Sequence, residues 1–115
     1  MAVRMTKPWR VLDDTGVARL TGQLGVYQLA GVDERIVFIG MAGGRSLFGL
    51  RGELERELEA RDPGRLGSVR FRVEVTMSYL TRCQELLMVH EADHGVLPSE
   101  NREGLPFTLG RLHPA

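Results

Sequence analysis

Two short apolar runs between residues 25 and 40 constrain the fold more than any other part of the sequence. The first begins with Gly25-Val26-Tyr27, and the second ends with Phe38-Ile39-Gly40. The joint between them, residues 31–35, is polar, contains Gly and Asp, and is too short for a helix. Two β-favouring runs joined in this way predict an antiparallel hairpin. The glycines inside the runs indicate close approach of another backbone or of a substrate.

Two helices are predicted after the hairpin. Leucines recur at helical spacing and predict an amphipathic helix that ends at residues 62–64, where the sequence is Asp-Pro-Gly. A second helix is predicted from Ser78 to His94, because Gly95 and then Pro98 follow it. The apolar stripe expected on the first helix consists of Leu47, Leu50, Leu54 and Leu58.

A strand is predicted between these helices, over residues 68–77. Apolar and polar residues alternate there, which is typical of a half-buried strand. The face predicted to be buried carries Val69, Phe71, Val73 and Val75. The expected fold class is α/β (α+β), with a small three-stranded antiparallel sheet, flanking helices and the element order β-β-α-β-α.

The chain length of 115 residues supports one small domain with a modest core. We expect residues 1–24 to be a lead-in arm anchored by Trp9, and residues 25–101 to form the domain. Residues 102–115 would be a C-terminal extension, in which the apolar residues 105–109 suit an extended edge segment.

The composition limits the cellular location of the protein more than it limits its function. No apolar run is long enough to cross a membrane. The single cysteine, Cys83, excludes an internal disulfide, fits a reducing cytoplasmic location and is expected to be buried as a small hydrophobe. The formal net charge is zero, which is not typical of a strong nucleic-acid binder.

The two tripeptides, the element order and the closing Leu97-Pro98-Ser99-Glu100-Asn101 together resemble the GIY-YIG nuclease superfamily. The resemblance covers about residues 25–101. It implies a metal-dependent endonuclease that hydrolyses phosphodiester bonds in DNA, with Mg²⁺ or Mn²⁺ as cofactor. A protein partner or a homodimer would supply additional binding.

The resemblance also implies a set of site residues. Tyr27 matches the tyrosine beside the attacking water, Arg51 the arginine of the first helix, and Glu85 the metal-binding glutamate of the later helix. Asn101 matches the asparagine after the proline and supports the site with Gly40. The second tripeptide carries Phe38 where the family has a tyrosine, so the ring is kept and the hydroxyl is lost.

Plainer interpretations of the same residues stay open. Arg51 would pair with Glu55 one helical turn on, and Glu85 would be a solvated helix residue. A domain that keeps the fold without the catalytic set would be a catalytically inactive binding or interaction module.

A third hypothesis rests on residues 90–94, which fit the pattern H-E-x-x-H. Residues four apart share a helix face, so His90 and His94 would reach one Zn²⁺ with Glu91 as the base of a zinc hydrolase. The sequence offers no third ligand at a familiar spacing. The alternative is a polar helix end whose histidines lie near the C-terminal dipole.

Overall fold

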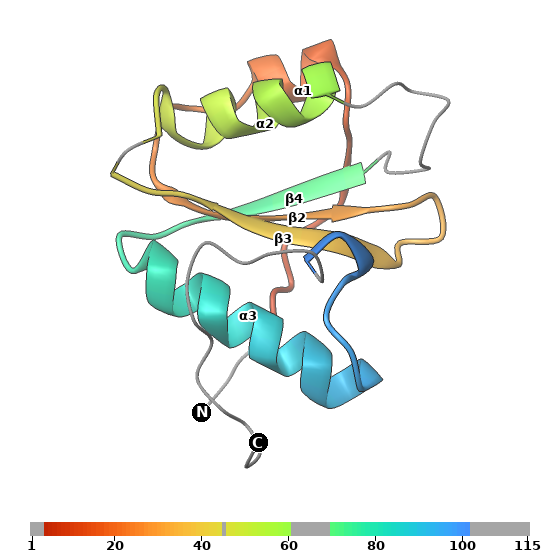
Figure 1. Ribbon diagram of the computed structural model, residues 1–115. Coiled ribbons are helices and arrows are strands. Elements are labelled where there is room, and N and C mark those ends of the chain that lie inside the picture. The colour runs from red at the N-terminus through yellow and green to blue at the C-terminus, as the bar shows by residue number, and fades with distance from the viewer. Residues whose placement is uncertain (1–3, 45, 61–69, 102–115) are drawn as a thin grey trace.

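The computed structural model describes residues 4–44, 46–60 and 70–101 and forms a four-stranded antiparallel sheet with helices on both faces (Figure 1). The strands β1 (Arg10–Val11), β2 (Gly25–Ala30), β3 (Ile36–Ala42) and β4 (Arg70–Val75) lie in the order β1-β4-β2-β3. Helices α1 (Asp14–Ala18) and α2 (Gly49–Ala60) cover one face, and α3 (Tyr79–His94) covers the other. A short 3₁₀ helix, η1 (Ser99–Asn101), follows α3.

The predicted hairpin is confirmed as β2 and β3. Tyr27 on β2 lies opposite Gly40 on β3, and the turn is closed by the N–H of Gly31, which donates to the carbonyl oxygen of Arg35 at 3.1 Å. Strand β2 also pairs with β4, so it is a central strand, whereas β3 is an edge strand.

The expected number of strands was wrong, because the sheet has four and not three. The additional strand, β1, is only two residues long, and its Arg10 pairs with Phe71 on β4. So short a strand carries no alternation that a sequence pattern could detect. Helix α1 follows at once, and its first turn is capped by Asp13, whose Oδ1 accepts from the N–H of Gly16 at 2.7 Å.

The sheet separates two apolar cores. On the α2 face, Leu50 and Leu54 are buried as predicted, and Leu58 is partly buried. Leu47 precedes the helix and is 77% exposed, so its predicted place in the stripe was wrong. The core on the α3 face consists of Met5, Val26, Ile39, Cys83, Leu86 and Leu87. Residues 4–24 therefore contribute a strand, a helix and core side chains to the same domain.

The alternation on β4 is confirmed in part. Phe71 is fully buried and Val73 packs against the core, but Val75 is 55% exposed. Val75 pairs with Gly25, which has no side chain to cover it. Three predictions concern residues that the structure does not describe: the burial of Val69, the helix end at residues 62–64 and the extended segment at residues 105–109.

Helix α3 ends where the sequence predicts. Gly95 adopts the left-handed conformation, with φ of 79°, and its N–H donates to the carbonyl oxygen of Glu91 at 2.7 Å. In the part of the chain that the structure describes, no helix is long and apolar enough to cross a membrane.

Candidate functional site: a groove at the edge of β3

A groove of about 290 Å³ runs over β3, the outer strand of the sheet, and we call it the edge groove. It brings together four residues that the resemblance implies: Tyr27, Phe38, Gly40 and Asn101. Helix α2 supplies polar groups to one side of the groove, and α3 supplies apolar ones to the other. The other lining residues are Ile39, Met41, Glu53, Arg56, Glu57, Cys83 and Leu87.

Tyr27 is held between the central strand and α2. Its side chain belongs to the core on the α2 face, and only 3% of the residue is exposed. Its hydroxyl donates to Oε2 of Glu57 on α2 at 2.8 Å. The ring lies 5.9 Å from that of Phe38, centroid to centroid, in a tilted arrangement. The phenol is therefore fixed in orientation and in contact with a carboxylate.

Gly40 leaves the space that the Tyr27 ring occupies. A Cβ atom at this position would lie 2.5 Å from Cζ of Tyr27 and 2.7 Å from Cε2 of Phe38. Both contacts are too short for real side chains, so any larger residue must displace one of the rings. This close approach explains the glycine in the second tripeptide.

We expect Gly40→Ala to destabilise the protein by about 1–3 kcal/mol, the usual cost of adding a methyl group to a packed site. Denaturant unfolding measures this loss. Gly44→Ala is the control, because a Cβ at Gly44 would meet only the Tyr79 hydroxyl, at 3.6 Å. Equal stability of the two variants would contradict the packing of Tyr27 over Gly40.

Three polar residues of α2 share the face that borders the groove. Arg56 and Glu57 follow Glu53 by three and four residues, which places both of them beside Glu53 on the helix. Nη1 of Arg56 lies 3.4 Å from Oε2 of Glu53, and the Arg56 side chain is mostly exposed. An ion pair whose arginine is mostly exposed contributes little to stability, so the guanidinium remains able to turn toward a ligand.

Asn101 fastens η1 to the edge of β3. Its Oδ1 accepts from the N–H of Ile39 at 2.8 Å, and its Nδ2 donates to the carbonyl oxygen of Ile39 at 3.0 Å. These two bonds occupy the backbone groups that an edge strand would otherwise present to another chain. The support that Asn101 gives to the groove is therefore structural.

Cys83 contributes packing rather than reactivity to the groove. The side chain is buried, as the sequence predicts, and burial raises the pKa of its thiol to about 12. The nucleophilic form of cysteine is the thiolate, which is scarce at neutral pH under these conditions.

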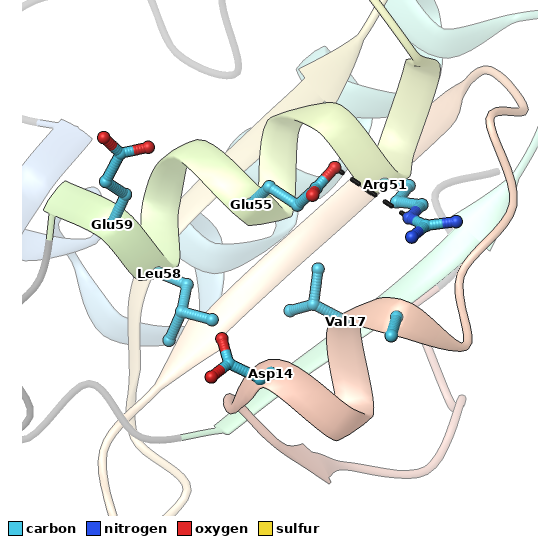
Figure 2. A pocket seen from close by; sticks show the side chains of 7 residues that line it. Asp14, Val17, Arg51, Glu55, Leu58 and Glu59 are labelled. Atoms are coloured by element: carbon cyan, nitrogen blue, oxygen red, sulfur yellow. Dashed lines mark ion pairs between the residues drawn. The ribbon is translucent and has the colours of Figure 1, made fainter.

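Arg51, which the resemblance implies as the catalytic arginine, lies outside the edge groove. It lines a separate pocket between α1 and α2, together with Asp14, Val17 and Glu55 (Figure 2). Its Nε lies 3.9 Å from Oε1 of Glu55, the pair that the plainer interpretation foresaw. Helix α2 thus presents Arg51 and Arg56 on different sides, and only Arg56 accompanies Tyr27.

Glu85, implied as the metal ligand, also lies outside the edge groove. It is ion-paired with Arg82 on the same helix, and the Nε of Arg82 donates to Oε2 of Glu74 on β4 at 2.8 Å. The hydrogen bond with Glu74 raises the pKa of the Arg82 guanidinium most, and burial opposes it. A guanidinium therefore already offsets the negative charge of Glu85. The structure does not bring Tyr27, Arg51 and Glu85 together.

The histidines of the H-E-x-x-H pattern do share one face of α3. The ring centroids of His90 and His94 are 4.4 Å apart, and Nδ1 of His90 lies 2.9 Å from the carbonyl oxygen of Val96. Asp93 between them is bound by Arg4. Within residues 4–44, 46–60 and 70–101, no three His, Cys, Asp or Glu side chains are grouped to hold a metal ion. The zinc hypothesis therefore lacks a third ligand in this part of the chain.

Comparison with protein families matches the chain to a family described as a domain of unknown function (DUF7508). The match spans residues 3–104, which is most of the chain. The chain belongs to this family. No curated protein matches the chain. No solved structure matches it either. The DUF7508 match includes the residues before Gly25 that form β1 and α1.

Sequence reasoning missed the three α2 residues of this DUF7508 domain that border the groove. In the sequence, Glu53, Arg56 and Glu57 do not stand out from the other charged residues of the helix. The available signal was that Arg56 and Glu57 follow Glu53 by three and four residues. The deciding information was the rotation of α2, which the burial of Leu50 and Leu54 fixes.

Proposed function

We propose that the domain hydrolyses phosphodiester bonds in DNA with the help of a divalent metal ion, as a divergent relative of the GIY-YIG nucleases, and that the edge groove is its active site. One observation carries the proposal. The hydroxyl of Tyr27 is hydrogen-bonded to Glu57 at 2.8 Å, in a groove that also contains Arg56.

The proposed roles follow from the chemistry of these groups. The phenol oxygen of Tyr27 takes a proton from the attacking water while its own proton passes to the Glu57 carboxylate. Arg56 presents a planar fork of donors to the phosphoryl oxygens and stabilises the charge that develops on them. Arg56 thus replaces Arg51 in the set that the resemblance implies, and Glu85 is left with Arg82.

The carboxylates of the groove fit a magnesium or manganese ion. Mg²⁺ keeps several of its waters and is often held by only one or two protein carboxylates. Glu53 would hold it, and the ion would neutralise charge on the phosphate. The groove carries two carboxylates against one guanidinium, so without a divalent cation its charge would repel DNA.

Matched variants on the two sides of α2 test this proposal. Tyr27→Phe, Glu57→Gln and Arg56→Met are each expected to lower the rate of Mg²⁺-dependent DNA cleavage about 10²-fold or more, the size typical of losing one acid–base or charge-stabilising group. Glu55→Gln and Arg51→Met are the controls, because they change the same residue types in the pocket between α1 and α2. Gel assays on single-stranded, duplex and branched DNA measure the rates.

The opposite pattern would overturn the assignment of roles. If Arg51→Met and Glu85→Gln lose cleavage while Arg56→Met keeps it, Arg51 and Glu85 are the catalytic residues, as the resemblance implies. Phe38→Tyr supplies the second hydroxyl of the GIY-YIG pattern and is expected to leave cleavage intact or increase it.

A second candidate function is a catalytically inactive binding module on the same fold. It is favoured by the separation of Tyr27, Arg51 and Glu85 and by the ion pairs that occupy the latter two. Absence of cleavage by the unaltered protein on all three DNA forms, with Mg²⁺ and with Mn²⁺, would select this candidate.

A further inference from the structure

Gln28 is a polar residue at the centre of the sheet, where an apolar one would be expected. It lies on β2 between Val26 and Ala30 of the same face, and only 3% of it is exposed. A buried amide is costly unless it forms hydrogen bonds. The burial of Gln28 therefore requires an explanation.

One half of the Gln28 amide is satisfied by Arg72 on β4. Nε of Arg72 donates to Oε1 of Gln28 at 2.6 Å. Because a guanidinium can only donate, the atom that faces it must be the amide oxygen. The amide nitrogen points elsewhere, and within the described residues its two hydrogens have no acceptor. The nitrogen is not sealed off, since the buried polar atoms without a partner in this part of the chain do not include it.

Gln28 and Arg72 line a cavity of about 110 Å³ between the sheet, the N-terminal arm and α3. A single water molecule needs roughly 10–15 Å³ of such a cavity volume. The cavity therefore has room for several waters or one small ligand and is too small for a nucleotide. The cavity lies against α3, on the face of the sheet opposite α2. The other lining residues are Arg4, Met5, Ile36, Leu86, Val89, His90, Asp93 and His94.

The polar lining of this cavity is rich in donors and positive charge. The carboxylate of Asp93 is held at both oxygens by Arg4, at 2.6 and 2.9 Å, so this pair is neutral. Arg72 has no such carboxylate: its guanidinium lies 4.2 Å from the Trp9 ring, and Nη1 reaches the carbonyl oxygen of Lys7 at 3.4 Å. Its Nη2 has no acceptor within the described residues.

Burial lowers the pKa of Arg72, and the charge of Glu34 opposes this shift without forming a hydrogen bond. An arginine that has lost solvation in this way gains most from a bound anion. The two histidines at the cavity wall add ring nitrogens that can donate when protonated.

We propose that this cavity binds a small oxyanion, a carboxylate or a phosphate group, with the Gln28 amide nitrogen and the Arg72 guanidinium as its donors. Because the cavity is small and apolar side chains form part of its wall, only the anionic group of a larger ligand would enter it. A metal cation is the less suitable occupant, because the Arg72 guanidinium lies at the cavity without a paired carboxylate, among the described residues, to offset its charge. The site is separate from the edge groove and does not depend on the function proposed for that groove.

Titration of the ¹⁵N-labelled full-length chain with inorganic phosphate, and separately with acetate, tests the proposal by NMR. We expect the largest shifts at the Gln28 side-chain amide and at His90 and His94. Gln28→Glu keeps an acceptor for Arg72 but replaces both amide hydrogens by negative charge, so affinity should fall at least tenfold. Gln23→Glu makes the same chemical change at an exposed position and should bind like the unaltered protein.

The two anions identify the ligand class, because a preference for phosphate indicates a phosphate group and a preference for acetate a carboxylate. Unchanged binding in Gln28→Glu, equal loss in Gln23→Glu, or an absence of shifts at Gln28 would overturn the proposal and leave a water-filled cavity. If Gln28→Glu folds poorly, Arg72→Lys keeps the charge and removes the fork of donors. Affinity unchanged in Arg72→Lys would count equally against the site.

Discussion

Replacing Phe71 by alanine is expected to lower the free energy of unfolding by about 3–5 kcal/mol, the usual cost of deleting a core aromatic side chain. Phe71 is fully buried on β4, opposite Leu29 of the central strand, and packs in the core beneath α1 and α2. Its removal leaves a cavity that strands on both sides cannot close, since β4 lies between β1 and β2. Urea unfolding followed by circular dichroism measures the change.

Val75→Ala on the same strand and face is the control for Phe71. Because Val75 is largely exposed, we expect a change within about 0.5 kcal/mol. A denaturant midpoint that barely moves in Phe71→Ala would contradict the described packing of the sheet.

Replacing Asn101 by alanine is expected to cost about 2–4 kcal/mol, because it leaves the N–H and the carbonyl group of Ile39 without partners. Asn101 is 3% exposed, so water does not readily replace its amide. Thermal and denaturant unfolding measure the loss. Hydrogen exchange at the Ile39 amide should accelerate in parallel, because this amide loses its acceptor.

Two further variants test whether the loss of stability comes from the hydrogen bonds of Asn101 or from any substitution in η1. Asn101→Asp keeps an acceptor for the N–H of Ile39 but opposes the carbonyl oxygen with negative charge, so it should also destabilise. Ser99→Ala, in the same 3₁₀ helix and exposed, should change stability by no more than about 0.5 kcal/mol. If Asn101→Ala behaves like Ser99→Ala, the proposed fastening of η1 to β3 is wrong.

The order of residues in the sequence does not determine which of two arginines on one helix faces the candidate site. Arg51 and Arg56 both follow the second tripeptide on the same helix, and sequence order favours the nearer one. An α-helix turns by about 100° per residue, so five residues place the two side chains about 140° apart around the axis. Only one of them can face Tyr27, and the burial of Leu50 and Leu54 turns Arg56 toward it.

The sequence by itself determined the elements whose patterns are local. The hairpin of β2 and β3 follows from two apolar runs around a polar joint, and the end of α3 follows from Gly95. The burial of Phe71 follows from alternation along β4. Each of these depends on neighbours within a few residues, which are adjacent in the sequence.

Only the tertiary structure decided what distant elements do to one another. It added β1, whose two residues are ordered by pairing with β4 and not by their own pattern. It placed Glu57 against Tyr27, thirty residues away, and Asn101 against Ile39, sixty-two residues away. It also paired Glu85 with Arg82 and buried Gln28 beside Arg72. These contacts depend on how helices are rotated and strands registered, and side-chain packing across the whole domain sets both.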